Sequence, residues 1–156
     1  MELVELFNQS AFQKAVTVTE MPVEAGDVIL AEGHPNTHVY AVLSGTARVS
    51  VDVDLGEDRH FKPGFADIDQ GNIFGEMSLF GAETASATVA AGPEGCTVAL
   101  VETAALRHYL DANPLVGYPI LRHMLEIMTQ RLSSGNKHVK ALFAWALKAH
   151  KIDQDL

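Results

Sequence analysis

The spacing of hydrophobic residues changes twice along the chain and divides it into three parts. Over residues 1–16 the apolar residues recur at helical spacing, which predicts a short N-terminal helix. Over 17–102, short runs rich in Val, Ile, Thr and Phe alternate with Gly, Pro and Asn, as in strands joined by turns. Helical spacing returns over 103–152. We therefore expect a single, mainly β domain over 1–156 with helices at both ends.

The middle part has the pattern of an antiparallel sandwich or barrel. Residues 47–54, "ARVSVDVD", alternate apolar and polar side chains, which predicts a strand with one buried and one solvated face. The charged stretch that follows, "DLGEDRHFKPG" at 54–64, contains two glycines and a proline. It is expected to form an exposed hairpin between two strands.

The last third predicts three helices. Thr103 is expected to cap the first, and Asn113 followed by Pro114 is typical of the start of the second. "SSGNK" at 133–137 is expected to break or kink this second helix, and "HVKALFAWALKAH" at 138–150 forms the third. The second helix carries an apolar stripe too broad for a helix in water, so another surface must cover it. The stripe consists of Ile120, Leu121, Met124, Leu125, Ile127, Met128 and Leu132.

Composition narrows the possible partners and compartments. With 47% apolar residues among 156, the chain is long enough for one well-buried core. Its 20 acidic and 11 basic residues give a net charge of −9, which repels nucleic acids and anionic membranes, so neither is an expected partner. No apolar run approaches the roughly 18 residues of a membrane span, and acids stand at the N-terminus where a signal peptide has bases. We expect a cytoplasmic protein.

Signals for an enzyme are weak. His34 and His38 resemble the first motif of metal-binding cupins, but three or four ligands must converge on one ion, and residues 41–45 offer none. Exposed loop histidines are the favoured interpretation. No nucleophile elbow, Walker loop or dinucleotide fingerprint is present. The sequence therefore predicts a non-enzymatic protein.

One stretch, "GNIFGEMSLFGAETASATVAA" at 71–91, carries a carboxylate without any cation. A short helix is expected after Gly75, and its first N–H groups would favour a bound anion. Alternatively, the carboxylate of Glu76, in the first turn of this helix, accepts hydrogen bonds from these N–H groups, while Phe74, Met77 and Leu79 pack in the core. The residues alone leave both interpretations open.

Two segments together resemble the cyclic-nucleotide-binding domain family. "AEGHPNTHVYAVLSGTARV" at 31–49 is similar to the strand–turn–strand signature E-G-D-x-x-x-x-x-Y-x-I-x-x-G-x-x-x-V. The stretch 71–91 is similar to the phosphate-binding cassette G-x-x-F-G-E-[LM]-[AS]-L followed, after a gap, by R-[AST]-A-[ST]-V. The resemblance extends through 96–102 and the helix beyond, so it covers nearly the whole chain in order.

The resemblance implies an N-terminal helix, an eight-stranded antiparallel β-roll of jelly-roll type over 17–102, and C-terminal helices that move when a ligand fills the roll. In this family the cassette glutamate binds the ribose hydroxyl, amides of the short helix hold the cyclic phosphate, and an arginine pairs with its charge. Carried over, Glu76 takes the ribose and Ser86 touches phosphate or purine. The implied binding residues are Phe74, Gly75, Glu76, Met77, Ser78, Ala85, Ser86 and Ala87.

The departure from the family pattern is Ala85, which stands at the arginine position. Loss of a charge-assisted pair of about 1.5–3 kcal/mol lowers affinity roughly 10–100-fold. We therefore expect a regulatory module whose cassette is degenerate toward cAMP and cGMP. The alternatives are an intact cAMP or cGMP receptor that uses Arg48, Arg59 or Lys62, or a protein-interaction scaffold that works through its C-terminal helices.

A second departure lies at the C-terminus. Transcription factors of this family append a helix-turn-helix domain of about 70 residues, whereas few residues follow Ser134 in this chain. It resembles a sensor without an output domain. Relatives commonly dimerise through the long helix, so we expect a homodimer through the C-terminal helices, or a protein partner on the same surface.

Overall fold

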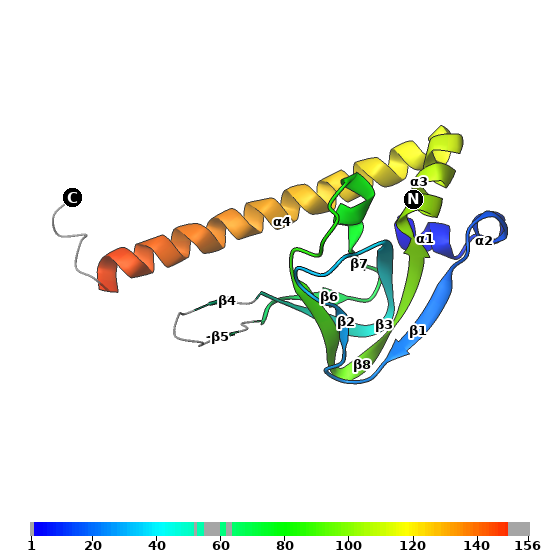
Figure 1. Cartoon of the computed structure of the whole chain (residues 1–156). Coiled ribbons are helices and arrows are strands. Elements are labelled where there is room, and N and C mark those ends of the chain that lie inside the picture. Colours follow the sequence, from blue (N-terminus) through cyan, green and yellow to red (C-terminus); the bar gives the residue numbers. More distant parts are fainter. Residues whose placement is uncertain (1, 52, 55–59, 62–63, 150–156) are drawn as a thin grey trace.

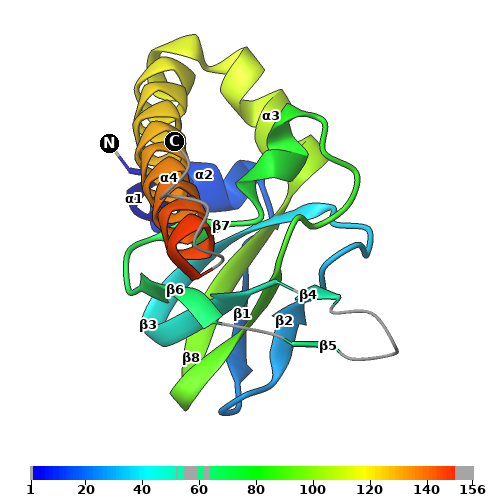
Figure 2. The ribbon, with the colours of Figure 1, turned by 90° about the vertical axis from the view of Figure 1, so that its left-hand side faces the viewer.

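The computed structural model describes residues 2–51, 53, 54, 60, 61 and 64–149. Within them an antiparallel roll is closed at one end by helices, and one long helix leaves the roll along one side (Figures 1 and 2). The helices are α1 (Leu3–Phe7), α2 (Ser10–Ala15), the 3₁₀ helix η1 (Glu76–Phe80), α3 (Thr103–Ala112) and α4 (Pro114–Ala149). The strands are β1 (Thr19–Val23), β2 (Val28–Leu30), β3 (His38–Ser50), β4 (Val53–Asp54), β5 (His60–Phe61), β6 (Gly64–Asp69), β7 (Ile73–Phe74) and β8 (Thr88–Glu102). The expected mainly β roll with flanking helices is confirmed.

The roll is built around two long strands, β3 and β8. They pair antiparallel from His38 opposite Glu102 to Ser50 opposite Thr88. Strands β1 and β2 pair with β8, while β6 and β7 pair with β3. The runs on either side of Gly45 therefore form one bent strand rather than two. Gly45 has φ 73°, and a Cβ there would lie 2.4 Å from the carbonyl of Gly95, so only glycine permits this close crossing.

The hairpin expected at 54–64 has its two strands, β4 and β5, paired through Val53 with Phe61 and Asp54 with His60. Residues 55–59, which join them, lie outside the described residues.

The N-terminal segment is two helices rather than the single helix expected over 1–16. The amide of Gln9 donates to the carbonyl of Leu6, and the Asn8 side chain donates to the carbonyl of Val4, so α1 ends before α2 begins. Both helices nevertheless bury their apolar residues in one cluster with the helical end of the roll and with α3 and α4. That cluster includes Leu3, Leu6, Phe7, Phe12, Val39, Val101, Leu106, Ile120 and Met124.

Two expectations about the C-terminal helices were wrong. Thr103 is not an N-cap: Glu102 precedes α3 as its cap, and the buried Thr103 hydroxyl bonds to Ser78 Oγ at 2.8 Å. Helix α4 is not interrupted at 133–137, because it continues through Gly135 to Ala149. One glycine costs about 1 kcal/mol inside a helix, which is too little to stop a helix of this length. The expected start at Asn113–Pro114 is confirmed, and the Asn113 side chain donates to the Tyr109 carbonyl of α3.

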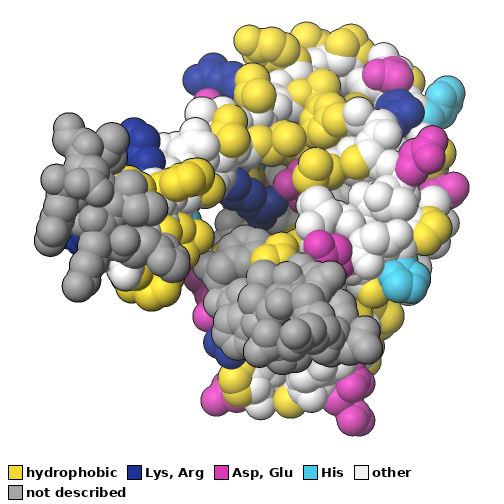
Figure 3. Space-filling model, turned by 60° about the vertical axis from the view of Figure 1, so that its left-hand side comes forward, with side chains coloured by type: hydrophobic (Ala, Val, Ile, Leu, Met, Phe, Trp, Pro, Cys, Tyr) yellow, Lys and Arg dark blue, Asp and Glu magenta, His cyan; other side chains and the backbone are white. Residues whose placement is uncertain are grey.

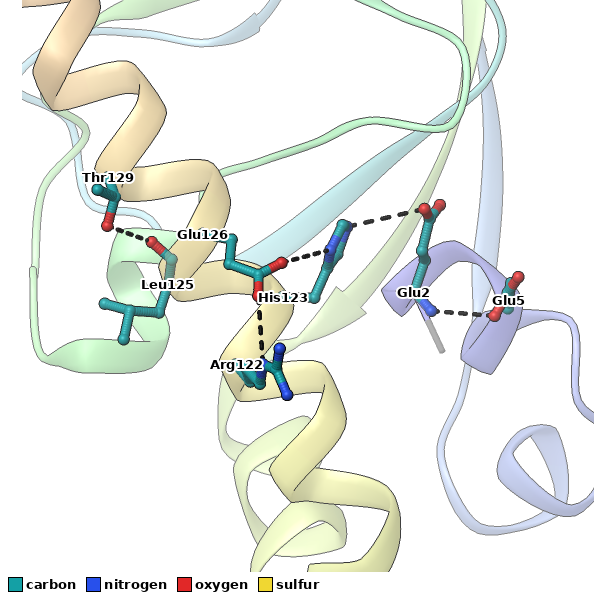
Figure 4. A network of polar contacts seen from close by, with 7 residues as sticks. All are labelled: Glu2, Glu5, Arg122, His123, Leu125, Glu126 and Thr129. Atoms are coloured by element: carbon teal, nitrogen blue, oxygen red, sulfur yellow. Dashed lines mark hydrogen bonds and ion pairs between the residues drawn. The ribbon is translucent and has the colours of Figure 1, made fainter.

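Helix α4 uses its two halves differently. Its first turns pack on the roll, and Gly117, Ile120 and Met124 are buried there. Beside α1, His123 lies between the carboxylates of Glu2 and Glu126, at 3.9 Å from each (Figure 4). The rest of the apolar stripe remains uncovered by this chain. Its exposed residues are Leu121, Leu125 and Leu132, and further along α4 the large apolar residues Val139, Leu142, Phe143 and Trp145 are exposed as well. None of the helices in the described part of the chain is both long and apolar enough to cross a membrane.

The packing of α3 makes a direct prediction about stability. Leu106 is fully buried, whereas Leu115, at the start of α4, is 92% exposed. Leu106→Ala should lower the free energy of unfolding by about 2–5 kcal/mol because it leaves a cavity in the core. Leu115→Ala, the matched control, should change it by less than about 0.5 kcal/mol. Urea unfolding of both variants measures this, and equal effects would contradict the packing described.

Candidate functional site

The roll and α4 line a cavity of about 530 Å³ that is open to solvent on one side. Its roll side is lined by apolar side chains of the strands, including Leu30, Val49, Phe74 and Val89. Its other side is formed by α4, from Ile127 to His138. Figure 3 shows this face of the molecule, with a hollow between the helix and the roll in which basic and acidic side chains lie together. All eight binding residues predicted from the sequence line this one cavity: Phe74, Gly75, Glu76, Met77, Ser78, Ala85, Ser86 and Ala87.

Gly75 fixes the turn that starts η1. It has φ 72°, and a Cβ at this position would lie 2.9 Å from both the His38 carbonyl and the Tyr40 ring. The carbonyl of Gly75 accepts hydrogen bonds from Asn36 Nδ2 at 3.1 Å and from Ser78 Oγ at 2.7 Å. Glycine is therefore required for the close packing of this turn on β3.

The remaining residues of η1 are mostly structural. Ser78 is buried and bonds to Gly75 and Thr103, so its hydroxyl ties η1 to α3. Arg107 of α3 donates to the carbonyls of Ser78 and Leu79, so α3 also provides hydrogen-bond partners for the carbonyl groups of η1. Phe74 of β7 stacks on Tyr40 with ring centroids 4.8 Å apart, and Phe74 and Leu79 are buried as expected. Met77 is exposed, so the expectation that it packs in the core was wrong.

Glu76 is only 5% exposed, and its carboxylate forms an ion pair with an arginine of α4. Arg131 Nη1 donates to Glu76 Oε1 at 2.5 Å, and Nη2 donates to the Ile73 carbonyl at 2.6 Å. The side-chain hydrogen bond of Glu76 thus goes to an arginine 55 residues away rather than to an amide of η1. We call this pair of hydrogen bonds the Arg131 clamp.

Sequence reasoning missed Arg131 because it searched the cassette and its neighbouring strands for a cation. A signal was present. Ile120, Met124, Ile127 and Arg131 follow one another at intervals of four, three and four residues, so an arginine continues the face of α4 that packs on the roll. An arginine on such a face needs a partner in the core, and Glu76 is the buried carboxylate there.

Ala85 is buried, and its backbone is held between Gly33 and His34 by hydrogen bonds of 2.8 and 2.9 Å. Ala85 also lines the cavity. The Ser86 hydroxyl, beside it, contacts the Met77 sulfur at 3.4 Å and is exposed.

Of the three substitute cations proposed from the sequence, Arg48 is the one that lies within the described residues. Arg48 pairs with Asp67 at 2.9 Å, and this hydrogen bond holds the pKa of Asp67 below its usual value. Arg59 and Lys62 lie outside the described residues.

The histidines considered for a metal are separated. His34 is exposed in the turn before β3, as expected for a loop histidine. His38 was also expected in a loop, but it is half-buried at the first position of β3. Among the described residues no group of three or more His, Cys, Asp or Glu side chains could hold a metal ion.

Solved structures share this architecture. The catabolite activator protein of Thermus thermophilus matches 88% of the chain with a TM-score of 0.66 and 22% identity. The sensor domain of the transcriptional regulator DNR from Pseudomonas aeruginosa matches 84% of it, with a TM-score of 0.66 and 16% identity. The regulatory domain of Toxoplasma gondii PKA with cAMP matches 58%, with a TM-score of 0.52 and 23% identity. At these identities the likeness shows the fold.

The chain spans 62% of the Thermus protein, 85% of the DNR sensor domain and 33% of the Toxoplasma chain. No curated protein matches the sequence. A family model described as "Cyclic nucleotide-binding domain" matches residues 20–113, which is more than half of the chain and contains both the strand–turn–strand segment and the cassette. The chain therefore belongs to the cyclic nucleotide-binding domain family.

Proposed function

We propose that this domain is a non-enzymatic regulatory module whose cassette is degenerate toward cAMP and cGMP. The observation that supports the proposal is Ala85, which lines the cavity and which the resemblance assigns to the position of the family's phosphate-binding arginine. A cyclic phosphate at this wall meets no side-chain cation from the cassette.

The remaining charges of the cavity do not compensate for this loss. Among the described lining residues the acids are Asp67 and Glu76, and the only Lys or Arg is Arg131. Both amino groups of Arg131 already donate, to Glu76 and Ile73. A phosphate would therefore enter a site that is neutral at best, and lose roughly 10–100-fold in affinity relative to a paired one.

A second candidate is an intact receptor that uses Arg131 as its phosphate partner. A guanidinium has five N–H donors, of which two are used in the clamp, and Arg131 lines the cavity. In this case the cation would have moved from the cassette to α4.

Calorimetric titration of cAMP and cGMP into the wild type and Ala85→Arg separates the two. Degeneracy predicts weak or no wild-type binding and at least about tenfold tighter binding by Ala85→Arg, because the guanidinium is restored. Ala104→Arg, which adds the same charge at an exposed position of α3, is the control and should resemble the wild type. Tight wild-type binding that Arg131→Gln abolishes would instead establish the second candidate.

The clamp itself should stabilise the domain by holding α4 on the roll. Arg131→Gln leaves a buried carboxylate unpaired and should lower the free energy of unfolding by about 1–3 kcal/mol, since the arginine is partly exposed. Arg131→Lys should fall between, because an ammonium lacks the planar fork that reaches both acceptors. Arg122→Gln breaks an exposed pair with Glu126 on the same helix (Figure 4) and should cost less than about 0.5 kcal/mol. Equal losses for the two glutamine variants in urea unfolding would show that the clamp adds no stability.

We further propose that α4 pairs with α4 of a second copy. One row of apolar and small residues on this helix, most of them exposed, repeats at alternating intervals of four and three, which is the spacing of a two-stranded coiled coil. We call this row the α4 seam; it consists of Leu121, Leu125, Met128, Leu132, Gly135, Val139, Leu142 and Ala146. Helix α4, which carries this row, extends well past the roll (Figure 1).

Leu132→Lys should convert a wild-type dimer into a monomer, because two ammonium groups would face each other in the seam. Ser133→Lys adds the same charge at the neighbouring exposed position outside the seam and should remain dimeric. Light scattering after size exclusion measures both. A monomeric wild type would contradict the dimer and favour the scaffold alternative, in which the seam binds another protein.

A further inference from the structure

The cavity has a wall suited to an uncharged, mostly apolar molecule. Its roll side presents Leu30, Val49, Ile68, Phe74 and Val89, and Ala85 adds a methyl group where a charged side chain would make this wall polar. The volume of about 530 Å³ is within the 300–1,000 Å³ of typical small-molecule sites. A body without charge can thus be buried here with a hydrophobic gain and without an unpaired ion.

The side formed by α4 and η1 offers hydrogen bonds rather than net charge. Of the two Glu76 carboxylate oxygens, only Oε1 has a hydrogen-bond partner in the described structure. Because no buried side-chain oxygen of the described residues lacks a partner, the other oxygen is open to solvent or ligand, and Glu76 lines the cavity. Gln130 and Ser134 of α4 line the same side, and their side chains make no hydrogen bond within the described residues.

Anions are disfavoured by the same arrangement. Arg131 is neutralised by Glu76, and Arg48 is neutralised by Asp67. Among the described lining residues His138 is the remaining basic side chain, and it lies at the end of the cavity formed by α4. An anionic group that drew Arg131 out of the clamp would leave Glu76 unpaired, and one that used the remaining N–H donors of Arg131 would meet a guanidinium whose charge Glu76 already balances.

We propose that the ligand of this cavity is uncharged, with a compact apolar body that packs on the roll wall and a hydroxyl or N–H group that donates to the second oxygen of Glu76. This inference rests on the proposed regulatory function and names the ligand class of the same site. The proposed ligand is uncharged, whereas the family pattern implies an anionic cyclic phosphate, and Ala85 is the residue that we expect to determine this difference.

Two fluorescent probes that differ in one sulfonate group test the proposal. N-phenylnaphthylamine and anilinonaphthalenesulfonate share their rings and their single N–H, and only the second is an anion. In fluorescence titrations of the whole chain the uncharged probe should bind at least about tenfold more tightly, since the sulfonate finds no free cation. Ala85→Arg should remove or reverse this preference by restoring a cation to the wall.

Two further variants locate the bound probe. Ala85→Phe places a ring in the cavity beside Glu76 and should weaken binding of the uncharged probe at least about tenfold, whereas Leu142→Gln removes an apolar residue of the α4 seam and should leave it unchanged. Binding that is lost in Leu142→Gln and kept in Ala85→Phe would place the probe on the seam and overturn the proposal.

The proposal would also be overturned if the sulfonate bound as tightly as the uncharged probe, or if neither bound. These failures are separate from failure of the proposed function, which is decided by tight binding of cAMP or cGMP to the wild type.

Discussion

The arrangement of this domain depends on one ion pair between a buried carboxylate and a helix distant in sequence. Glu76 is held inside the roll by the turn at Gly75, where it would be costly without a counter-charge. Arg131 supplies that charge and a second hydrogen bond to Ile73. The clamp thereby places α4 along the open side of the roll, so that a helix, rather than a loop, forms one wall of the cavity.

The same pair determines what the cavity can bind. An arginine that balances a buried glutamate contributes no net charge to a ligand, and the cassette position that could have supplied one is Ala85. Under the proposed function, in which Ala85 replaces the cassette cation, the pocket is neutral rather than negative. Apolar contact and hydrogen-bond geometry, rather than charge, would then select the ligand.

Local sequence patterns predicted the fold and one wall of the cavity, but they could not predict contacts between residues far apart in the sequence. The cassette residues from Phe74 to Ala87 lie within one stretch, so their motif located the cavity wall. Arg131 could not be paired with Glu76 from spacing alone, because only the packing of α4 on the roll brings them together. The helix break expected at Gly135 was wrong for a related reason. The residue's own preference favours a helix end, but the helical turns on both sides of Gly135 keep α4 continuous.

Helix α4 also connects the cavity to the α4 seam, because the two use adjacent faces of the same turns. Arg131, Ser134 and His138 line the cavity, Leu132 and Val139 belong to the seam, and Gly135 lies in both. A helix turns as a unit, so a ligand that changes how α4 lies against Glu76 must also change the direction in which the seam faces. The clamp is the contact through which such a change would pass, since it is the polar link that fixes the cavity-facing side of α4 to both Glu76 and Ile73.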